Sequence, residues 1–244
     1  MKDQKEFYEK YWNDRKVKGR LHTKEGMWSP KRINIATDKI IRDIKSGKKS
    51  QVNVLDIGCG EGTLGKLLKE QLQNKVFIVG CDISETALKL ASPYYDKIFQ
   101  TNIETTELSE LIKQKFDYIV IVEVLEHLFN PKDVLKRCRK LLNEDGFLIA
   151  SFPNVAFYKY RLDMLRGYFP KNYLLYPGEH IQNFTLYSFY KLLHENGFIP
   201  VEIDGQFVFP RIFKPRRIFL PLFKKFPGLF GYQIVVKFKK DKNL

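Results

Sequence analysis

Val54-Leu55-Asp56-Ile57-Gly58-Cys59-Gly60-Glu61-Gly62 is the most informative stretch of this 244-residue chain. It joins a short apolar run at 52–57 to a segment with leucines at helical spacing: Leu64, Leu67, Leu68 and Leu72. Glycines let the backbone turn sharply and approach a ligand closely. The helix that follows offers free N–H groups at its first turn. The stretch therefore predicts a strand, a ligand-binding turn and a helix.

The glycine spacing also matches another kind of site. Gly60-x-Gly62-x-x-Gly65 has the spacing of the dinucleotide fingerprint. However, the turn begins earlier, at Asp56-Ile57-Gly58, with an acidic residue where dinucleotide sites usually run from an apolar strand into glycine. Gly65 falls inside the predicted helix, where it can allow close packing. An NAD-dependent enzyme is therefore the less favoured alternative.

Strand and helix patterns alternate along the rest of the chain. Expected strands are 52–57, 76–81, 97–101, 117–122, 146–152, 198–203 and 233–238. Helices are expected over 31–45 and after Ser84, Asn130-Pro131 and Thr185. This order predicts an α/β fold with a doubly wound, mostly parallel sheet of seven strands.

The same pattern predicts the domain organisation. Residues 51–206 and 232–240 form the core, and residues 1–50 form a basic helical arm or lid. Two segments interrupt the core, at 155–184 and 207–231. We expect 155–184 to wall the acceptor site, with tyrosines that stack on a ring or simply pack together.

Charge is concentrated at the two ends of the chain. The net charge is +14, with 15 Lys and Arg against 7 acids in residues 1–50, and 10 against 1 in residues 207–244. This suggests an anionic partner near the termini, either a phosphate-bearing substrate, a nucleic acid or a membrane surface. A solvated, lysine-rich surface is the alternative for the N-terminal stretch.

Segment 207–231 combines cations with bulky apolar residues, and its prolines preclude one long helix. This composition is typical of an interfacial anchor, so we expect contact with an anionic membrane or a lipid phosphate. A dimer surface or a lid are the alternatives, and the oligomeric state stays open.

The three cysteines, Cys59, Cys81 and Cys138, have no disulfide or zinc spacing. The N-terminus has no apolar signal-peptide region, and no apolar run reaches the ~18 residues of a membrane span. We therefore expect a cytoplasmic protein with reduced thiols, peripheral at the inner membrane face if the anchor operates.

An acidic residue, Asp82, ends the second expected strand. A carboxylate there can accept both ribose hydroxyls of a nucleoside, and its alternative role is to cap the next helix. With Asp82 added to the glycine turn and to the alternating strands and helices, the sequence resembles the class I S-adenosylmethionine-dependent methyltransferases over about residues 50–206 plus the last strand.

The resemblance implies a Rossmann-like methyltransferase fold with an antiparallel last strand and S-adenosylmethionine as cofactor, released as S-adenosylhomocysteine. By position in the family's motifs, Glu123 lies beside the methionine moiety and Asp82 binds the ribose. The remaining cofactor-binding positions are Asp56, Gly58, Gly60, Gly62, Ile83, Asn102 and Ile103.

Glu123-Val124-Leu125-Glu126-His127 follows the fourth expected strand. On a helical turn residues 123, 126 and 127 share one face. With His180, these residues are candidate ligands of Mg²⁺ or Mn²⁺. Without a metal, His127 is the first candidate for the catalytic base and His180 the second. The pattern resembles ubiquinone-biosynthesis O-methyltransferases, which act on catechols, and small-RNA 3′-terminal 2′-O-methyltransferases.

Residues 151–154 (SFPN) and 160–167 (YRLDMLRG) resemble methyltransferases of bacterial surface-polysaccharide and lipid-linked sugar pathways, and a methionine-biosynthesis-associated branch. We therefore expect O-methylation of a sugar, glycan or lipid-linked small-molecule hydroxyl. A metal-dependent RNA or catechol methyltransferase is one alternative. A non-catalytic binding protein is another, because a fold alone does not prove activity.

Overall fold

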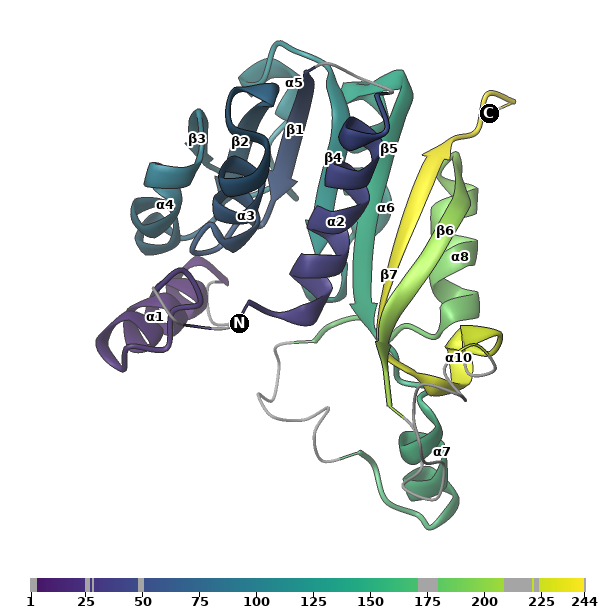
Figure 1. The fold of residues 1–244 in the computed structure, drawn as a ribbon. Coiled ribbons are helices and arrows are strands. Elements are labelled where there is room, and N and C mark those ends of the chain that lie inside the picture. Colours follow the sequence, from purple (N-terminus) through teal and green to yellow (C-terminus); the bar gives the residue numbers. More distant parts are fainter. Residues whose placement is uncertain are drawn as a thin grey trace.

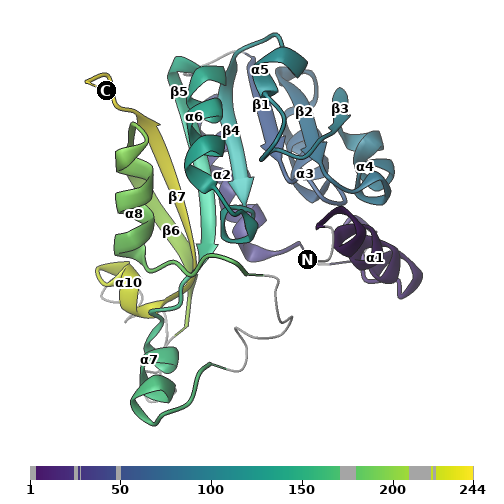
Figure 2. The same cartoon turned by 180° about the vertical axis from the view of Figure 1, so that it is seen from behind.

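The computed structural model describes residues 4–24, 27, 29–47, 51–170, 180–208, 221 and 224–243. A seven-stranded sheet of order β3-β2-β1-β4-β5-β7-β6 lies between two layers of helices (Figures 1 and 2). The strands are β1 (Val52–Ile57), β2 (Val76–Asp82), β3 (Lys97–Gln100), β4 (Phe116–Val122), β5 (Leu142–Pro153), β6 (Phe198–Phe207) and β7 (Gly231–Lys240). Only β7 pairs antiparallel with its neighbours, so the predicted fold class is confirmed.

Helices cover both faces of the sheet. They are α1 (Gln4–Val17), α2 (Lys31–Lys45), α3 (Thr63–Leu72), α4 (Glu85–Ala91), α5 (Leu108–Leu111), α6 (Pro131–Leu141), α7 (Tyr158–Leu165), α8 (Leu186–Glu195) and α10 (Pro227–Phe230). One buried core lies under α2, α3 and α4, and the other lies under α5, α6 and α8. Successive residues of β4, such as Ile119 and Val120, point into opposite cores. Both faces of this strand are therefore buried, which is why it is apolar.

The predicted helix starts have a physical basis in the structure. The Ser84 hydroxyl accepts the Ala87 N–H at 3.1 Å, and the Thr185 hydroxyl accepts the Ser188 N–H at 3.1 Å. Pro131 opens α6, where its missing N–H costs no hydrogen bond. Each of the two hydroxyls accepts a hydrogen bond from a backbone N–H that has no partner within its helix, which stabilises the helix by about 1 kcal/mol.

The strand order places the site. β1 and β4 are neighbours at the centre, and the chain proceeds from them toward opposite edges. Loops after these two strands therefore diverge and leave a crevice at their carboxyl ends, where ligands bind in open α/β sheets. Helix α1 lies at this end of the sheet in both views (Figures 1 and 2).

The last two strands are longer than their apolar runs predict. Their antiparallel pairing continues from Phe198↔Lys240 to Phe207↔Gly231. Most of segment 207–231, and residues 171–179 of the other interruption, lie outside the described residues. Within the part of the chain that the structure describes, no helix is both long and apolar enough to span a bilayer.

Candidate functional site

A cavity of about 310 Å³ opens at the carboxyl ends of the central strands. Its walls come from the turns after four strands, from α1, from residues 30–33 and from His180. It contains most of the predicted cofactor residues: Asp56, Gly58, Gly60, Asp82, Ile83, Asn102, Ile103 and Glu123. Gly62 is not among the lining residues. The structure thus brings together residues that lie up to more than sixty positions apart in the sequence, from Asp56 to Glu123.

The turn after β1 needs its glycines. Gly58 and Gly60 have φ of +72° and +54°, a region that side chains rarely adopt. A Cβ on Gly58 would lie 2.5 Å from Val124. The Gly58 and Cys59 N–H groups donate to the Cys81 carbonyl at 2.8 and 3.1 Å. These bonds tie the turn to β2 and hold its backbone at the cavity wall.

Asp82 both organises the turn and faces the cavity. Its two carboxylate oxygens accept the Gly60 and Ser84 N–H groups, each at 2.9 Å. A carboxylate oxygen has two lone pairs, so each can accept a further ligand hydroxyl. Burial raises the pKa of Asp82, while the backbone hydrogen bonds lower it. Helix α4 is capped by Ser84 and not by Asp82, so the capping alternative is not supported, and Asp82 keeps the capacity to accept ribose hydroxyls.

A second buried carboxylate, Asp56, lies beneath the turn. Burial raises its pKa to about 7, and the negative Asp82 nearby adds to the rise. The Tyr95 hydroxyl donates to Asp56 at 2.5 Å, which opposes the rise. The wall therefore holds two desolvated acids, a setting that favours a ligand with positive charge.

At Gly62 and Gly65, neighbouring atoms leave no room for a side chain. Gly62 caps α3 at φ +88°, and a Cβ there would lie 2.8 Å from the Ala91 Cα. Gly65 lies within α3, where a Cβ would lie 2.5 Å from the Tyr95 ring. The expected packing role of Gly65 is confirmed.

Glu123 does not share a helical turn with Glu126 and His127, so that geometric expectation was wrong. Its φ is +56°, which directs the chain away before the short 3₁₀ turn Leu125–His127 begins. Its carboxylate accepts Ser151 Oγ and Gln233 Nε2, each at 3.0 Å, and Arg32 Nε lies 3.7 Å away. A glutamate with a positive φ has a strained backbone, and the contacts from β5, β7 and α2 hold it in that conformation.

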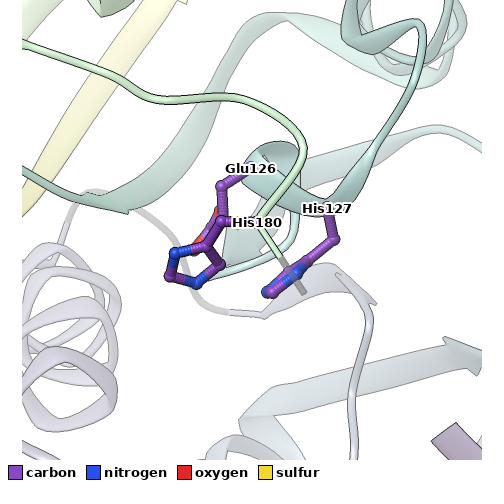
Figure 3. Close-up of side chains that lie close together, drawn as sticks. All are labelled: Glu126, His127 and His180. Atoms are coloured by element: carbon purple, nitrogen blue, oxygen red, sulfur yellow. The ribbon is translucent and has the colours of Figure 1, made fainter. Parts of the chain in front are cut away.

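Glu126, His127 and His180 do converge (Figure 3). Each offers a ligand atom, and these atoms lie within 4.8 Å of one another. The Glu126 carbonyl accepts the Ile181 and Gln182 N–H groups at 2.8 Å, which brings the His180 segment to this turn. Burial lowers the pKa of His180, which favours the neutral imidazole. Both histidines line the cavity.

Helix α1 supplies cavity residues that sequence reasoning did not single out. Gln4, Tyr8, Tyr11, Trp12 and Arg15 all line the cavity. Their spacing is that of one helical face, so periodicity within the arm could have found them. Arg32, at the start of α2, was also missed because its partner Glu123 lies far away in sequence.

Side-chain contacts hold α1 over the site. Gln4 donates to the His127 carbonyl at 3.0 Å, and Arg15 lies 3.6 Å from the buried Glu61. The Glu9 carboxylate accepts the Glu85 and Thr86 N–H groups at the start of α4. The Trp12 ring covers Gly60, where a Cβ would meet it at 2.6 Å.

The segment expected to wall the acceptor site is placed differently. Among its described residues, His180 alone lines the cavity. Tyr160 is buried against Phe157, and their rings lie 5.5 Å apart. Tyr173 and Tyr176 lie outside the described residues. Tyr158 and Tyr160 therefore fit the packing alternative, whereas Tyr168 is exposed and does not line the cavity.

Known proteins resemble this chain in sequence and in fold. A family model described as "Methyltransferase domain" matches residues 55–148. The ubiquinone biosynthesis O-methyltransferase of Coxiella burnetii is 30% identical over 131 residues, which is 52% of this chain and 54% of that protein. Its counterpart from Glaesserella parasuis is 37% identical over 118 residues, 44% of this chain and 46% of that one. The chain thus spans about half the length of these curated relatives.

Solved structures agree on the fold. The plantazolicin methyltransferase BpumL, in complex with a substrate analogue and S-adenosylhomocysteine, has a TM-score of 0.63 at 18% identity, covering 98% of this chain and 96% of that one. Magnesium protoporphyrin IX methyltransferase from Synechocystis has a TM-score of 0.61 at 18% identity, covering 97% and 100%. Residues 55–148 thus match a methyltransferase domain, and the fold around them is that of solved methyltransferases that bind S-adenosylhomocysteine.

Proposed function

We propose that this protein transfers a methyl group from S-adenosylmethionine to an acceptor hydroxyl. The observation that carries the proposal is that one cavity is lined both by the Asp82 carboxylate with the glycine turn and by His127 with His180. The first pair suits a nucleoside ribose, and the second suits a proton acceptor beside the reacting methyl.

The cofactor's groups match the polarity of the walls. Asp82 accepts the ribose hydroxyls, and Asn102 and Ile103 flank the adenine. The methionine end of the cofactor carries an ammonium and a carboxylate. The Glu123 carboxylate can pair with the ammonium and the Arg32 guanidinium with the carboxylate, since both residues line the cavity. The buried acids Asp56 and Asp82 favour the positive sulfonium over neutral nucleosides.

The reaction needs alignment and a proton acceptor. The acceptor oxygen forms a bond to the methyl carbon as the carbon–sulfur bond breaks, and the electron pair returns to sulfur as S-adenosylhomocysteine forms. The hydroxyl proton passes to His127 or His180. Since the sulfonium is already activated, the protein chiefly orients the two reactants and excludes water, to which α1 contributes as a cover.

The same side chains also suit a metal. Two imidazoles and a carboxylate within 4.8 Å are a donor set for a divalent cation such as Mg²⁺ or Mn²⁺. Such an ion supplies Lewis acidity that lowers the pKa of a bound hydroxyl. This second candidate favours an acceptor with two adjacent oxygens, catechol-like or an RNA terminus. The metal-free candidate favours a sugar or lipid-linked hydroxyl.

Calorimetry tests first whether S-adenosylhomocysteine binds and then whether a metal binds. We expect S-adenosylhomocysteine to bind the wild type, His127→Ala and the control His194→Ala alike, since His194 lies on α8 outside the cavity lining. Absence of binding to the wild type would instead indicate a non-catalytic methyltransferase-like protein. Titration of Mn²⁺ into the saturated protein then separates the candidates. Heat that His127→Ala abolishes and His194→Ala retains assigns the metal, and its absence favours the metal-free candidate.

A further inference from the structure

The two segments that interrupt the core pack against each other. The Tyr158 and Phe230 rings lie 5.7 Å apart, and Val208 packs against the buried Phe157 and Tyr160. The Phe157 ring also lies 5.6 Å from the ring of Tyr232, at the start of β7. Residues 155–170, 208 and 224–232 therefore form one body, here named the distal lobe. It includes α7 and α10.

The outer surface of the distal lobe is apolar. Its exposed large side chains are Leu162, Met164, Leu165, Tyr168, Phe169 and Phe226. Leu165 is 83% exposed and Tyr168 is 65% exposed. Single exposed apolar residues are ordinary on a protein surface, but a group on one body marks a binding surface.

Cations accompany these side chains. Lys159, Arg161 and Arg166 lie on or beside α7, and Lys224 and Lys225 precede α10. The described residues of the distal lobe hold five Lys and Arg and one acid, Asp163. The nearest acid to Arg166 is the exposed Asp163, 4.0 Å away. The lobe is thus apolar and strongly positive at once.

This chemistry selects one partner. Two positive lobes repel each other, so a second copy of this chain is disfavoured. Single-stranded RNA favours flat aromatic platforms, whereas three of the six exposed side chains, Leu162, Met164 and Leu165, are aliphatic. Bulky apolar side chains between cations are suited to the headgroup boundary of an anionic bilayer.

We propose that the distal lobe docks this protein on an anionic lipid bilayer. The lobe lies at the same end of the sheet as α1 (Figures 1 and 2). Docking through α7 therefore turns the cavity end of the sheet toward the headgroups. The docking is independent of catalysis, since the surface shares no residue with the cavity lining.

Co-sedimentation of the full chain with vesicles tests the proposal at low salt, without cofactor. We expect binding to phosphatidylglycerol-containing vesicles and not to pure phosphatidylcholine. Leu165→Asp should weaken binding at least about 10-fold, since it places a charge at the apolar contact. Val201→Asp, at an exposed apolar residue of β6 outside the lobe, is the control and should bind as the wild type does.

A second pair keeps the test decisive if Leu165→Asp disturbs folding. Arg166→Gln should weaken binding about 5-fold, from roughly 1 kcal/mol per cation near the surface. Lys136→Gln should change nothing, although Lys136 is as exposed (66% against 68%) and also has an acid three residues away. Lack of wild-type binding, or equal effects within either pair, overturns the proposal. So does a dimer lost in Leu165→Asp without any vesicle binding.

Discussion

The cavity has two walls of different construction. The wall from the strand ends is buried and bonded to itself, with Asp82 holding the Gly60 and Ser84 N–H groups. The wall from α1 is held by a few side-chain contacts, and none of the residues Gln4–Val17 is buried. An element with little buried surface opens at small cost in free energy. We therefore expect the strand-end wall to select the ligand and α1 to open and close as the ligand passes.

The largest effect is expected from breaking the strand-end wall. Asp82→Ala removes the acceptor of two backbone N–H groups and of the proposed ribose hydroxyls. Hydrogen bonds to a charged group contribute about 1.5–3 kcal/mol each, so affinity for S-adenosylhomocysteine should fall on the order of 100-fold. Calorimetric titration measures this, with Asp133→Ala on α6 as a surface control. Near-wild-type affinity in Asp82→Ala would place the ribose elsewhere.

A smaller effect should separate the two walls. Gly60→Ala drives a methyl group into the Trp12 ring, whereas at Gly47, which also has a positive φ, the methyl group meets nothing within 4 Å. Both should lose about 1 kcal/mol of stability from backbone strain. Only Gly60→Ala should also displace α1.

Limited trypsin digestion without ligand measures that displacement, through cleavage at Arg15 and Lys16. We expect at least a few-fold faster cleavage in Gly60→Ala than in Gly47→Ala or the wild type. Equal rates in all three proteins would mean that Trp12 does not hold the arm closed.

The smallest effect is the change that Tyr95→Phe makes in the pH dependence of stability, which sharpens the description of the buried wall. The pKa of Asp56 is raised to about 7 from 3.8, so the folded protein keeps a proton that the unfolded chain releases. The contribution of Asp56 to stability is therefore fully present below about pH 4 and is lost as pH rises toward 7. Tyr95→Phe removes a hydrogen bond that lowers this pKa, so the loss should extend to higher pH.

Urea unfolding from pH 4 to pH 8 checks this expectation, with Asp56→Asn as the control that removes the dependence. Identical pH profiles for the wild type and Tyr95→Phe would contradict the assigned role of that hydroxyl.

Much of the fold follows from local patterns in the sequence. The apolar run at 52–57, the glycine turn and the leucines of α3 lie within about twenty residues, and β1 and α3 form where they predict. The caps at Ser84 and Thr185 act on donors three residues away. Such features depend on backbone geometry over one turn or one strand, so spacing alone is sufficient to predict them.

Contacts between distant segments could not be predicted in this way. Arg32 meets Glu123, Tyr8 lies edge-on to His127, and Tyr158 meets Phe230 only because packing brings their elements together. The left-handed φ of Glu123 likewise depends on Ser151 and Gln233 of two other strands. The sequence by itself determined the sheet, the turn and the acids along its edge. The tertiary structure decided which face of the arm covers the cavity and that two separate segments form one lobe, because these depend on packing between residues far apart in the chain.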